Sequence, residues 1–117
     1  MAPTALIVDD HAGFRASARR LLTACGYEVV GEAGDAAGAL AAIERLSPWL
    51  VLLDVVLPDG DGIELARQLE DVPGDHRLVL VSSREREELA SALEGAPITG
   101  FLAKDELCAS ALRRLLA

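Results

Sequence analysis

The sequence predicts a single α/β domain, in which a five-stranded parallel sheet is doubly wound by helices on both faces. Two observations support this fold class. Five short apolar runs alternate with five segments of helical periodicity, and the chain has 117 residues of which 51% are hydrophobic, enough for one domain with a buried core. Regular alternation of this kind is typical of parallel sheets, because each parallel strand is reached through a crossover connection.

The predicted strands are apolar runs bounded by charged residues or by turn residues. The central run, WLVLLD at Trp49–Asp54, shows no alternation of apolar and polar positions, which suits a strand covered on both faces. In chain order the five predicted strands are Thr4–Val8, Tyr27–Ala33, Trp49–Asp54, His76–Val81 and Ile98–Ala103.

The segments between these strands carry apolar residues at helical spacing. The first helix begins near Ala12 and ends at Gly26, a residue that suits a helix C-terminus. The fourth has a thin apolar stripe of Leu89, Ala92 and Leu93, so we expect it to be weakly anchored. The five helices are predicted over residues 12–25, 35–46, 63–70, 85–94 and 106–116.

Composition excludes several classes of function. The net charge of -8 argues against direct binding of nucleic acid, which requires clustered basic residues. The first residues, MAPTALIVDD, lack the basic region of a signal peptide, and no apolar run approaches the length of a membrane span, so we expect a cytoplasmic protein without membrane contact. Cys25 and Cys108 are predicted to be small core residues, with no disulfide or metal role.

Polar side chains end four of the five predicted strands. They are Asp9 with Asp10, Asp54, Ser82 and Lys104. The carboxyl ends of parallel strands share one edge of the sheet, so we expect these groups to meet in a crevice there. Three carboxylates at one place require a cation, and oxygen ligands with room for water suit Mg²⁺. Such a site suits phosphoryl transfer, with Asp54 as nucleophile, Lys104 as point charge and Ser82 as hydroxyl donor.

Each of these features also has an ordinary structural explanation. Acids before a helix can cap it, an acid after a strand can stabilise a turn, and a lysine can be a solvated surface amine. The acids at positions 59 and 61 are predicted to be solvated turn residues, and the two histidines, His11 and His76, to lie on the surface without binding metal. An aspartyl phosphatase is disfavoured, because Asp9 and Asp10 are adjacent where that class needs a D-x-D loop.

Four motifs together resemble the receiver domain of two-component response regulators. They are IVDDH at residues 7–11, LLDVVLPDGDGIEL at 52–65, VSS at 81–83 and GFLAKD at 100–105. The resemblance covers the whole chain, residues 1–117, and implies a flavodoxin-like sheet with strand order 2-1-3-4-5. The alternative is a ligand-binding or scaffolding module on the same fold that never accepts phosphate, since fold does not determine function.

The resemblance also implies residue roles and partners. Asp54 matches the phospho-acceptor, Asp10 a direct Mg²⁺ ligand, Asp9 a ligand through water, and Val56 a residue that offers its backbone carbonyl to the metal. The phosphoryl donor is then a sensor histidine kinase or a phosphotransfer protein. Such a domain catalyses its own phosphorylation and dephosphorylation but acts as a switch, so its standing as an enzyme is left open.

The same resemblance predicts a conformational switch. Ser82 and Lys104 match groups that contact the phosphoryl group, and Phe101 matches an aromatic residue that changes rotamer on activation. The expected output is an altered protein-interaction face, for an output partner or a second receiver. His11 and the LAKD segment resemble the subfamily usually fused to a helix-turn-helix domain, and no segment of the 117 residues resembles such a domain.

Overall fold

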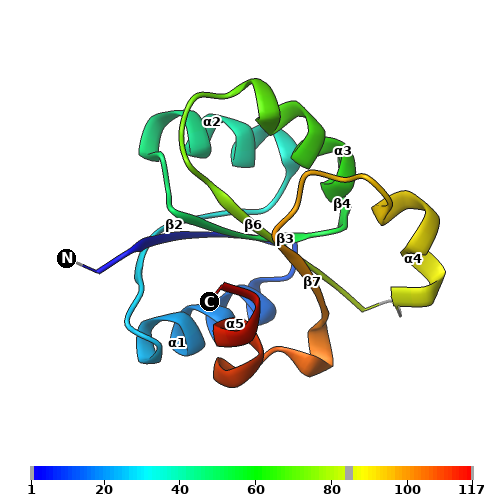
Figure 1. The fold of residues 1–117 in the computed structure, drawn as a ribbon. Coiled ribbons are helices and arrows are strands. Elements are labelled where there is room, and N and C mark those ends of the chain that lie inside the picture. The colour runs from blue at the N-terminus through cyan, green and yellow to red at the C-terminus, as the bar shows by residue number, and fades with distance from the viewer. Residues whose placement is uncertain (1, 84–85, 117) are drawn as a thin grey trace.

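The computed structural model describes residues 2–83 and 86–116. Its main sheet has five parallel strands in the order β2-β1-β3-β6-β7, which is 2-1-3-4-5 when these five strands are counted along the chain (Figure 1). The predicted fold class and strand order are therefore confirmed. The strands are β1 (Thr4–Val8), β2 (Glu28–Ala33), β3 (Leu50–Asp54), β6 (Arg77–Ser82) and β7 (Gly100–Ala103).

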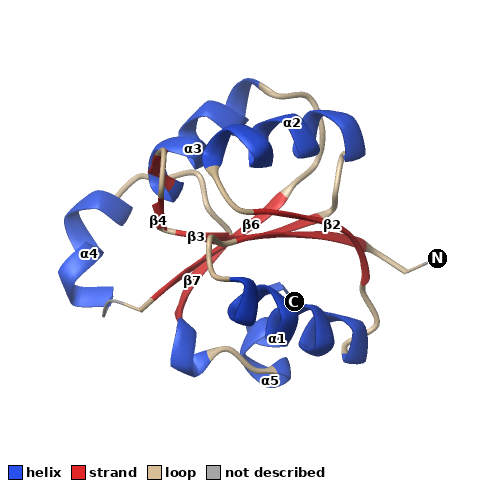
Figure 2. Ribbon diagram, turned by 180° about the vertical axis from the view of Figure 1, so that it is seen from behind, coloured by secondary structure: helices blue, strands red, loops and turns tan. Residues whose placement is uncertain are grey.

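Helices cover both faces of this sheet. One face carries α1 and α5, the other carries α2 and α3, and α4 lies at the edge beside β7 (Figures 1 and 2). The helices are α1 (Ala12–Ala24), α2 (Ala36–Leu46), α3 (Gly62–Gln68), α4 (Arg86–Leu93) and α5 (Ala109–Leu116), with short 3-10 turns at η1 (Leu69–Asp71) and η2 (Lys104–Glu106). No helix in the described part of the chain is long and apolar enough to span a bilayer.

The sheet divides the core into two apolar clusters. All five residues of β3 are buried, as its unbroken apolar run predicts, and successive side chains enter opposite clusters. Val51 and Leu53 pack on the side of α2 and α3, where Ile43 is fully buried. Leu50 and Leu52 pack on the side of α1 and α5. The central strand is thus rigidly held, which fixes the position of the residue at its carboxyl end.

Local signals set several helix ends. Asp35 caps α2, because its side chain accepts a hydrogen bond from Gly38 N at 2.7 Å. Ser47 ends the same helix in the left-handed region, with φ of 44°. After α1, Gly26 adopts a φ of 94°, a conformation that glycine reaches without steric cost. The predicted stop at Gly26 is therefore explained by its backbone geometry.

Three sequence predictions were wrong in detail. The last helix begins at Ala109 and not at residue 106, because Leu107 is extended, with φ -68° and ψ 114°. Cys108 consequently does not follow the apolar stripe of α5 and is exposed, whereas Cys25 is half-buried. In α4, Leu89 is buried but Ala92 is exposed, so the predicted apolar stripe is thinner still. The predicted helix start at residue 85 lies outside the described residues.

The structure also contains a small hairpin that the sequence did not predict. Strands β4 (Val56–Leu57) and β5 (Gly60–Asp61) pair antiparallel directly after β3. The turn between them contains Pro58 and Asp59, residues that favour turns. This hairpin forms the loop next to Asp54.

Candidate functional site

The carboxyl ends of the strands bring the predicted polar residues to one edge of the sheet. Val8 of β1 is in register with Leu53 of β3, so the residues that follow them, Asp9 and Asp54, are neighbours. Ser82 ends β6, one residue after Val81, which is the register partner of Asp54. On β7, Ser82 is in register with Ala103, and Lys104 follows directly. All four strand-end positions are therefore adjacent, as the parallel topology requires.

Lys104 joins the two buried carboxylates. Its Nζ lies 2.6 Å from Asp9 Oδ2 and 3.4 Å from Asp54 Oδ2. Its side chain is 20% exposed, and its Nζ also lies 4.5 Å from the centre of the Phe14 ring. The explanation of Lys104 as a solvated surface amine is therefore wrong.

The acids after β1 do not cap α1. The N-cap residue of that helix is His11, whose side chain makes no capping hydrogen bond. Asp9 is fully buried, and its Oδ1 accepts the His11 backbone N–H at 2.8 Å. Asp10 is more exposed, and its Oδ1 lies 3.0 Å from His11 Nδ1. The ordinary explanation of these two acids as helix caps is excluded by this geometry.

The donor set fits a divalent cation. Asp9, Asp10, His11 and Asp54 each offer one ligand atom, and these four atoms all lie within 4.8 Å of one another. Among the described residues, Asp9 Oδ2 has no well-directed hydrogen-bond partner, although Lys104 Nζ lies close to it. That ammonium group pairs with Asp9 Oδ2, but the site has three carboxylates and one lysine, and carboxylate oxygens are ligands that Mg²⁺ prefers. The backbone amide of Val56 lies 3.4 Å from Asp54 Oδ1, and the predicted role of its carbonyl stays a prediction.

The carboxylates of this cluster differ in acidity. Burial and the nearby charge of Asp9 raise the pKa of Asp54 to about 6, and attraction to Lys104 only partly offsets this. For Asp9, burial opposes ionisation, but the Lys104 ammonium and the His11 amide outweigh it, so its pKa lies below the usual value. Burial likewise opposes the charge of Lys104, and the two carboxylates reverse this and raise its pKa. Asp9 therefore forms the closer ion pair with Lys104, and Asp54 is the acid of the two that binds a proton first as the pH falls.

The hairpin after Asp54 is tied to its surroundings by two acids. Asp59 Oδ1 and Oδ2 accept the backbone N–H groups of Ala36 at 2.7 Å and Ala37 at 3.1 Å, at the first turn of α2. These bonds lower the pKa of Asp59. Asp61 caps α3 by accepting from Ile63 N at 2.7 Å. Asp59 and Asp61 are both exposed, as predicted, and each also accepts backbone N–H groups at the start of a helix, which the sequence did not predict.

Gly62 closes the loop against the strand end. Its N–H donates to Val55 O at 2.7 Å, and a Cβ at this position would approach Asp54 O to 2.2 Å. The close approach, and not an unusual φ, therefore requires glycine here. On the opposite side, Arg15 Nη1 donates to Asp9 O at 2.6 Å and its Nε pairs with Glu32 Oε1 at 3.1 Å. Sequence patterns did not indicate Arg15, because it lies on the polar side of the α1 stripe.

The two predicted switch residues are both buried. Ser82 is 1% exposed and Phe101 is 3% exposed. Phe101 belongs to the same apolar cluster as Leu80 and Leu89, so its ring already lies inside the protein in this structure. A rotamer change of Phe101 stays a prediction, and the structure represents its inward position.

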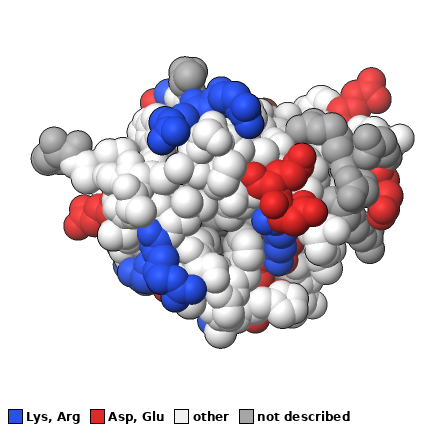
Figure 3. All heavy atoms as spheres, turned by 90° about the horizontal axis from the view of Figure 1, so that it is seen from below, with Lys and Arg blue, Asp and Glu red and all other residues white. Residues whose placement is uncertain are grey.

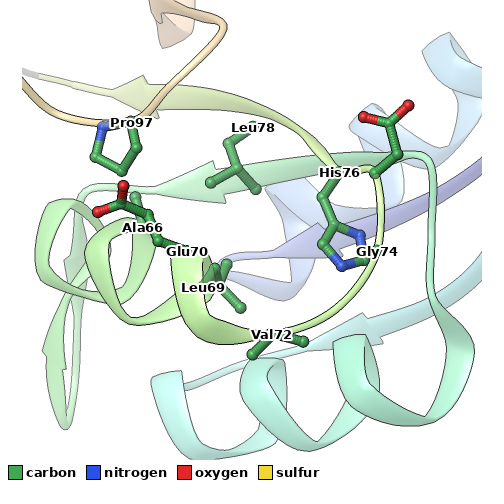
Figure 4. A pocket seen from close by; sticks show the side chains of 9 residues that line it. Ala66, Leu69, Glu70, Val72, Gly74, His76, Leu78 and Pro97 are labelled. Atoms are coloured by element: carbon green, nitrogen blue, oxygen red, sulfur yellow. The ribbon is translucent and has the colours of Figure 1, made fainter.

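A separate cavity lies near the amino end of β6, on the opposite side of the sheet from the carboxyl ends that carry the acids. It has a volume of about 200 Å³ and is bounded by η1, the loop before β6 and Pro97 (Figure 4). Its residues His76 and Leu78 stand at the amino end of β6, whereas Ser82 stands at the carboxyl end, so the cavity is not part of the acidic site. His76 is half-buried and its Nδ1 donates to Pro48 O at 2.8 Å, which is a structural role.

Trp49 also lies at the amino ends of the strands, far from the acidic site. It precedes β3 and stacks on Tyr27, with ring centres 6.2 Å apart. Five residues of extended strand place it about 16 Å from Asp54, given roughly 3.3 Å per residue. Trp49 therefore reports on folding but not directly on the acidic site.

The fold and the strand-end cluster together define the receiver domain of a response regulator. The family model of the response regulator receiver domain matches residues 5–115, and the chain belongs to this family.

The basic side chains of the protein form separate groups on the face that carries α1 and α5, and acidic side chains lie between these groups (Figure 3).

Particular relatives include both transcription regulators and chemotaxis proteins. The chain is 41% identical over 102 residues to the DNA-binding transcriptional activator DevR/DosR of Mycobacterium tuberculosis, covering 85% of this chain and 46% of that protein. It is 31% identical over 104 residues to the chemotaxis protein CheY of Bacillus subtilis, covering 89% and 87%. The chain spans about half the length of the transcriptional regulators it matches, 49% and 46% in two cases.

A solved structure agrees with this assignment. The signal receiver domain of the putative response regulator NarL from Mycobacterium tuberculosis superposes with a TM-score of 0.85 at 29% identity, covering 99% of this chain and 98% of that one. The similarity therefore extends over the whole fold and includes the edge that carries the acids.

Proposed function

We propose that this receiver domain accepts a phosphoryl group on Asp54 in a Mg²⁺-dependent reaction and thereby changes a protein-interaction face. The observation that carries the proposal is the position of Lys104, whose Nζ lies 2.6 Å from Asp9 and 3.4 Å from Asp54. A buried nucleophile, a second carboxylate and an ammonium group in this arrangement suit transfer of an anionic group. The donor would be a sensor histidine kinase, a phosphotransfer protein or a small phosphodonor such as acetyl phosphate.

The residues of the chain have distinct tasks in this reaction. An Asp54 carboxylate oxygen attacks phosphorus as the bond from phosphorus to the donor breaks, and the donor leaves with the electron pair of that bond. Lys104 compensates the negative charge on the transferred group, and the Ser82 hydroxyl donates a hydrogen bond to it. Asp9, Asp10 and Asp54, with the Val56 carbonyl, would hold the Mg²⁺ ion. When bound, that ion would neutralise the negative charges of the three carboxylates and of the phosphoryl oxygens.

Intact-mass measurement tests the site. We expect a single phosphate adduct on the wild-type protein after treatment with acetyl phosphate and Mg²⁺, and none with excess EDTA. Asp54→Asn should give no adduct, while Asp71→Asn, which removes an exposed acid in η1, should behave as wild type. The adduct should be stable in acid and labile in alkali, as expected of an acyl phosphate.

The outcomes separate the two candidate functions. A full-strength adduct on Asp54→Asn would contradict the assignment of the nucleophile. A folded wild-type protein that takes no phosphate from acetyl phosphate or from any kinase would favour the alternative of a phosphorylation-independent ligand-binding or scaffolding module.

The proposed output is a change in the segment between Ser82 and Phe101. Phosphorylation should draw Ser82 and Lys104 toward the phosphoryl group and reposition α4, which buries Leu89 but exposes Ala92 and therefore resists movement weakly. A coupling free energy of about 1 to 3 kcal/mol would change the affinity for a partner roughly 5 to 150-fold.

Hydrogen exchange with and without beryllofluoride, a mimic of the phosphoryl group, tests the switch. We expect changes in protection in α4 and β7. Changes confined to the loop after Asp54 would show that the switch does not use this face.

The proposed partners follow from charge. With a net charge of -8, the domain should bind protein surfaces, such as an output partner or a second receiver, and not DNA directly. A cytoplasmic location is part of this proposal.

A further inference from the structure

The cavity near the amino end of β6 has the composition of a small-molecule pocket. Its floor is formed by Ala66, Leu69 and Leu78, which are buried and belong to the apolar cluster on the side of α2 and α3 (Figure 4). Its rim carries two exposed acids, Glu70 and Asp75. An apolar floor with a few polar groups around it is typical of sites that bind and orient small ligands.

The rim of the cavity is negatively charged. Asp75 pairs with Arg77, which does not line the cavity, whereas Glu70 forms no ion pair within the described part of the chain. The described residues that line the cavity include no lysine or arginine. The Glu70 carboxylate is therefore the uncompensated charge of this rim.

The His76 ring adds a hydrogen-bond acceptor at the other end of the cavity (Figure 4). Its Nδ1 donates to Pro48 O at 2.8 Å, so Nε2 carries the lone pair of the ring. Nε2 is buried and has no hydrogen-bond partner among the residues that the structure describes. Gly74 lies against it, since a Cβ there would approach Nε2 to 2.7 Å. The side chains around the cavity thus accept hydrogen bonds and offer no free donor.

The size of the cavity limits the ligand. Its volume of about 200 Å³ is below the range of pockets that enclose drug-sized molecules, roughly 300 to 1,000 Å³. An apolar cavity of roughly 150 Å³ is nevertheless sufficient to bind benzene. A ligand with one ring or one short branched chain therefore fits, and the exposed rim lets it enter from solvent.

We propose that this cavity binds a small organic ammonium ion, with its apolar body on Leu69 and Leu78 and its charged group at the Glu70 carboxylate. The N–H groups of an ammonium ion match a rim that offers acceptors only. The net charge of -8 attracts cations to the protein and repels organic anions. No residue of the cavity belongs to the acidic cluster at the carboxyl ends of the strands, so this inference goes beyond the proposed phosphoryl transfer and does not depend on it.

Titration with three probes that share one apolar body tests the inference. The probes are phenethylamine, which is a cation, phenethyl alcohol, which is neutral, and phenylpropionate, which is an anion. Each is added to the isotope-labelled full chain at neutral pH, and the backbone amide shifts are followed by NMR. Glu70→Gln removes the proposed counter-ion. The matched control is Asp71→Asn, which removes another exposed acid of η1 that does not line the cavity.

We expect phenethylamine to bind with a dissociation constant of roughly 0.1 to 1 mM, as suits so small a ligand, and to shift the amides of residues 66–78 and 96–98. The alcohol should bind several-fold more weakly, and the anion more weakly again. Glu70→Gln should weaken binding of the amine about two- to fivefold, because solvent screens an exposed charge, and should leave binding of the alcohol unchanged. Asp71→Asn should alter neither.

Four results would each overturn the inference. They are absence of saturable amine binding, equal affinities for the amine and the alcohol, equal losses for both probes in Glu70→Gln, and amide shifts that fall outside the two segments.

Discussion

Replacing Asp54 with asparagine should raise the free energy of unfolding of the metal-free protein at neutral pH. Asp54 is 5% exposed, and its pKa rises from 3.8 to about 6 on folding. The folded state therefore binds more protons than the unfolded state between these values, and stability falls as pH rises through this window. At 1.36 kcal/mol per unit, a shift of about two units corresponds to a cost of about 3 kcal/mol at neutral pH. Asparagine removes that cost.

The assay is urea unfolding in EDTA at pH 4 and pH 7.5, followed by Trp49 fluorescence, because Trp49 lies far from the substituted residue. We expect Asp54→Asn to exceed wild type by about 1 to 3 kcal/mol at pH 7.5 and by much less at pH 4, where the Asp54 carboxyl is mostly protonated. Mg²⁺ should stabilise the wild type and leave Asp54→Asn nearly unchanged. Asp71→Asn, at an exposed position, should show no such pH dependence.

A stabilisation of equal size at both pH values would show that the gain does not come from the charge of Asp54. A loss of stability at pH 7.5 would refute the reasoning altogether, because the attraction to Lys104 would then outweigh burial.

Three further predictions concern the loops around the site. Asp10→Ala should weaken Mg²⁺ binding, measured by calorimetry, more than Asp9→Ala does, because Asp10 is expected to bind the ion directly and Asp9 through a water molecule. The loss of affinity for Asp9→Ala should be roughly tenfold. Equal losses in the two variants would contradict this order. Gly62→Ala should cost about 1 to 3 kcal/mol of stability in urea unfolding, because its Cβ would approach the Asp54 carbonyl oxygen to 2.2 Å; wild-type stability would show that the loop relaxes freely. Asp59→Ala should lower the urea midpoint more than Asp59→Asn, because asparagine retains one acceptor for the amides at the start of α2; equal midpoints would show that these bonds contribute nothing.

The sequence alone determined the sheet and the residues at the carboxyl ends of its strands. The apolar run of β3 and the alternation of strands with helices depend on local patterns, which the sequence displays directly. Asp9, Asp54, Ser82 and Lys104 each follow an apolar run immediately, and parallel strands place such residues at one edge whatever the details of packing. Their convergence was therefore predictable before any distance was known.

The tertiary structure decided which of these groups touch. Lys104 pairs more closely with Asp9 than with Asp54, although both acids precede it by many residues, because register and side-chain direction are set by packing that no local pattern encodes. The same holds for Asp59, which reaches the amide groups of α2 across a distance of 23 residues in the sequence. The His11 ring likewise lies 3.2 Å from Asp9 Oδ1 and 3.0 Å from Asp10 Oδ1, which no sequence pattern indicated. Contacts between distant segments depend on how the helices pack on the sheet, and that arrangement is a property of the folded chain as a whole.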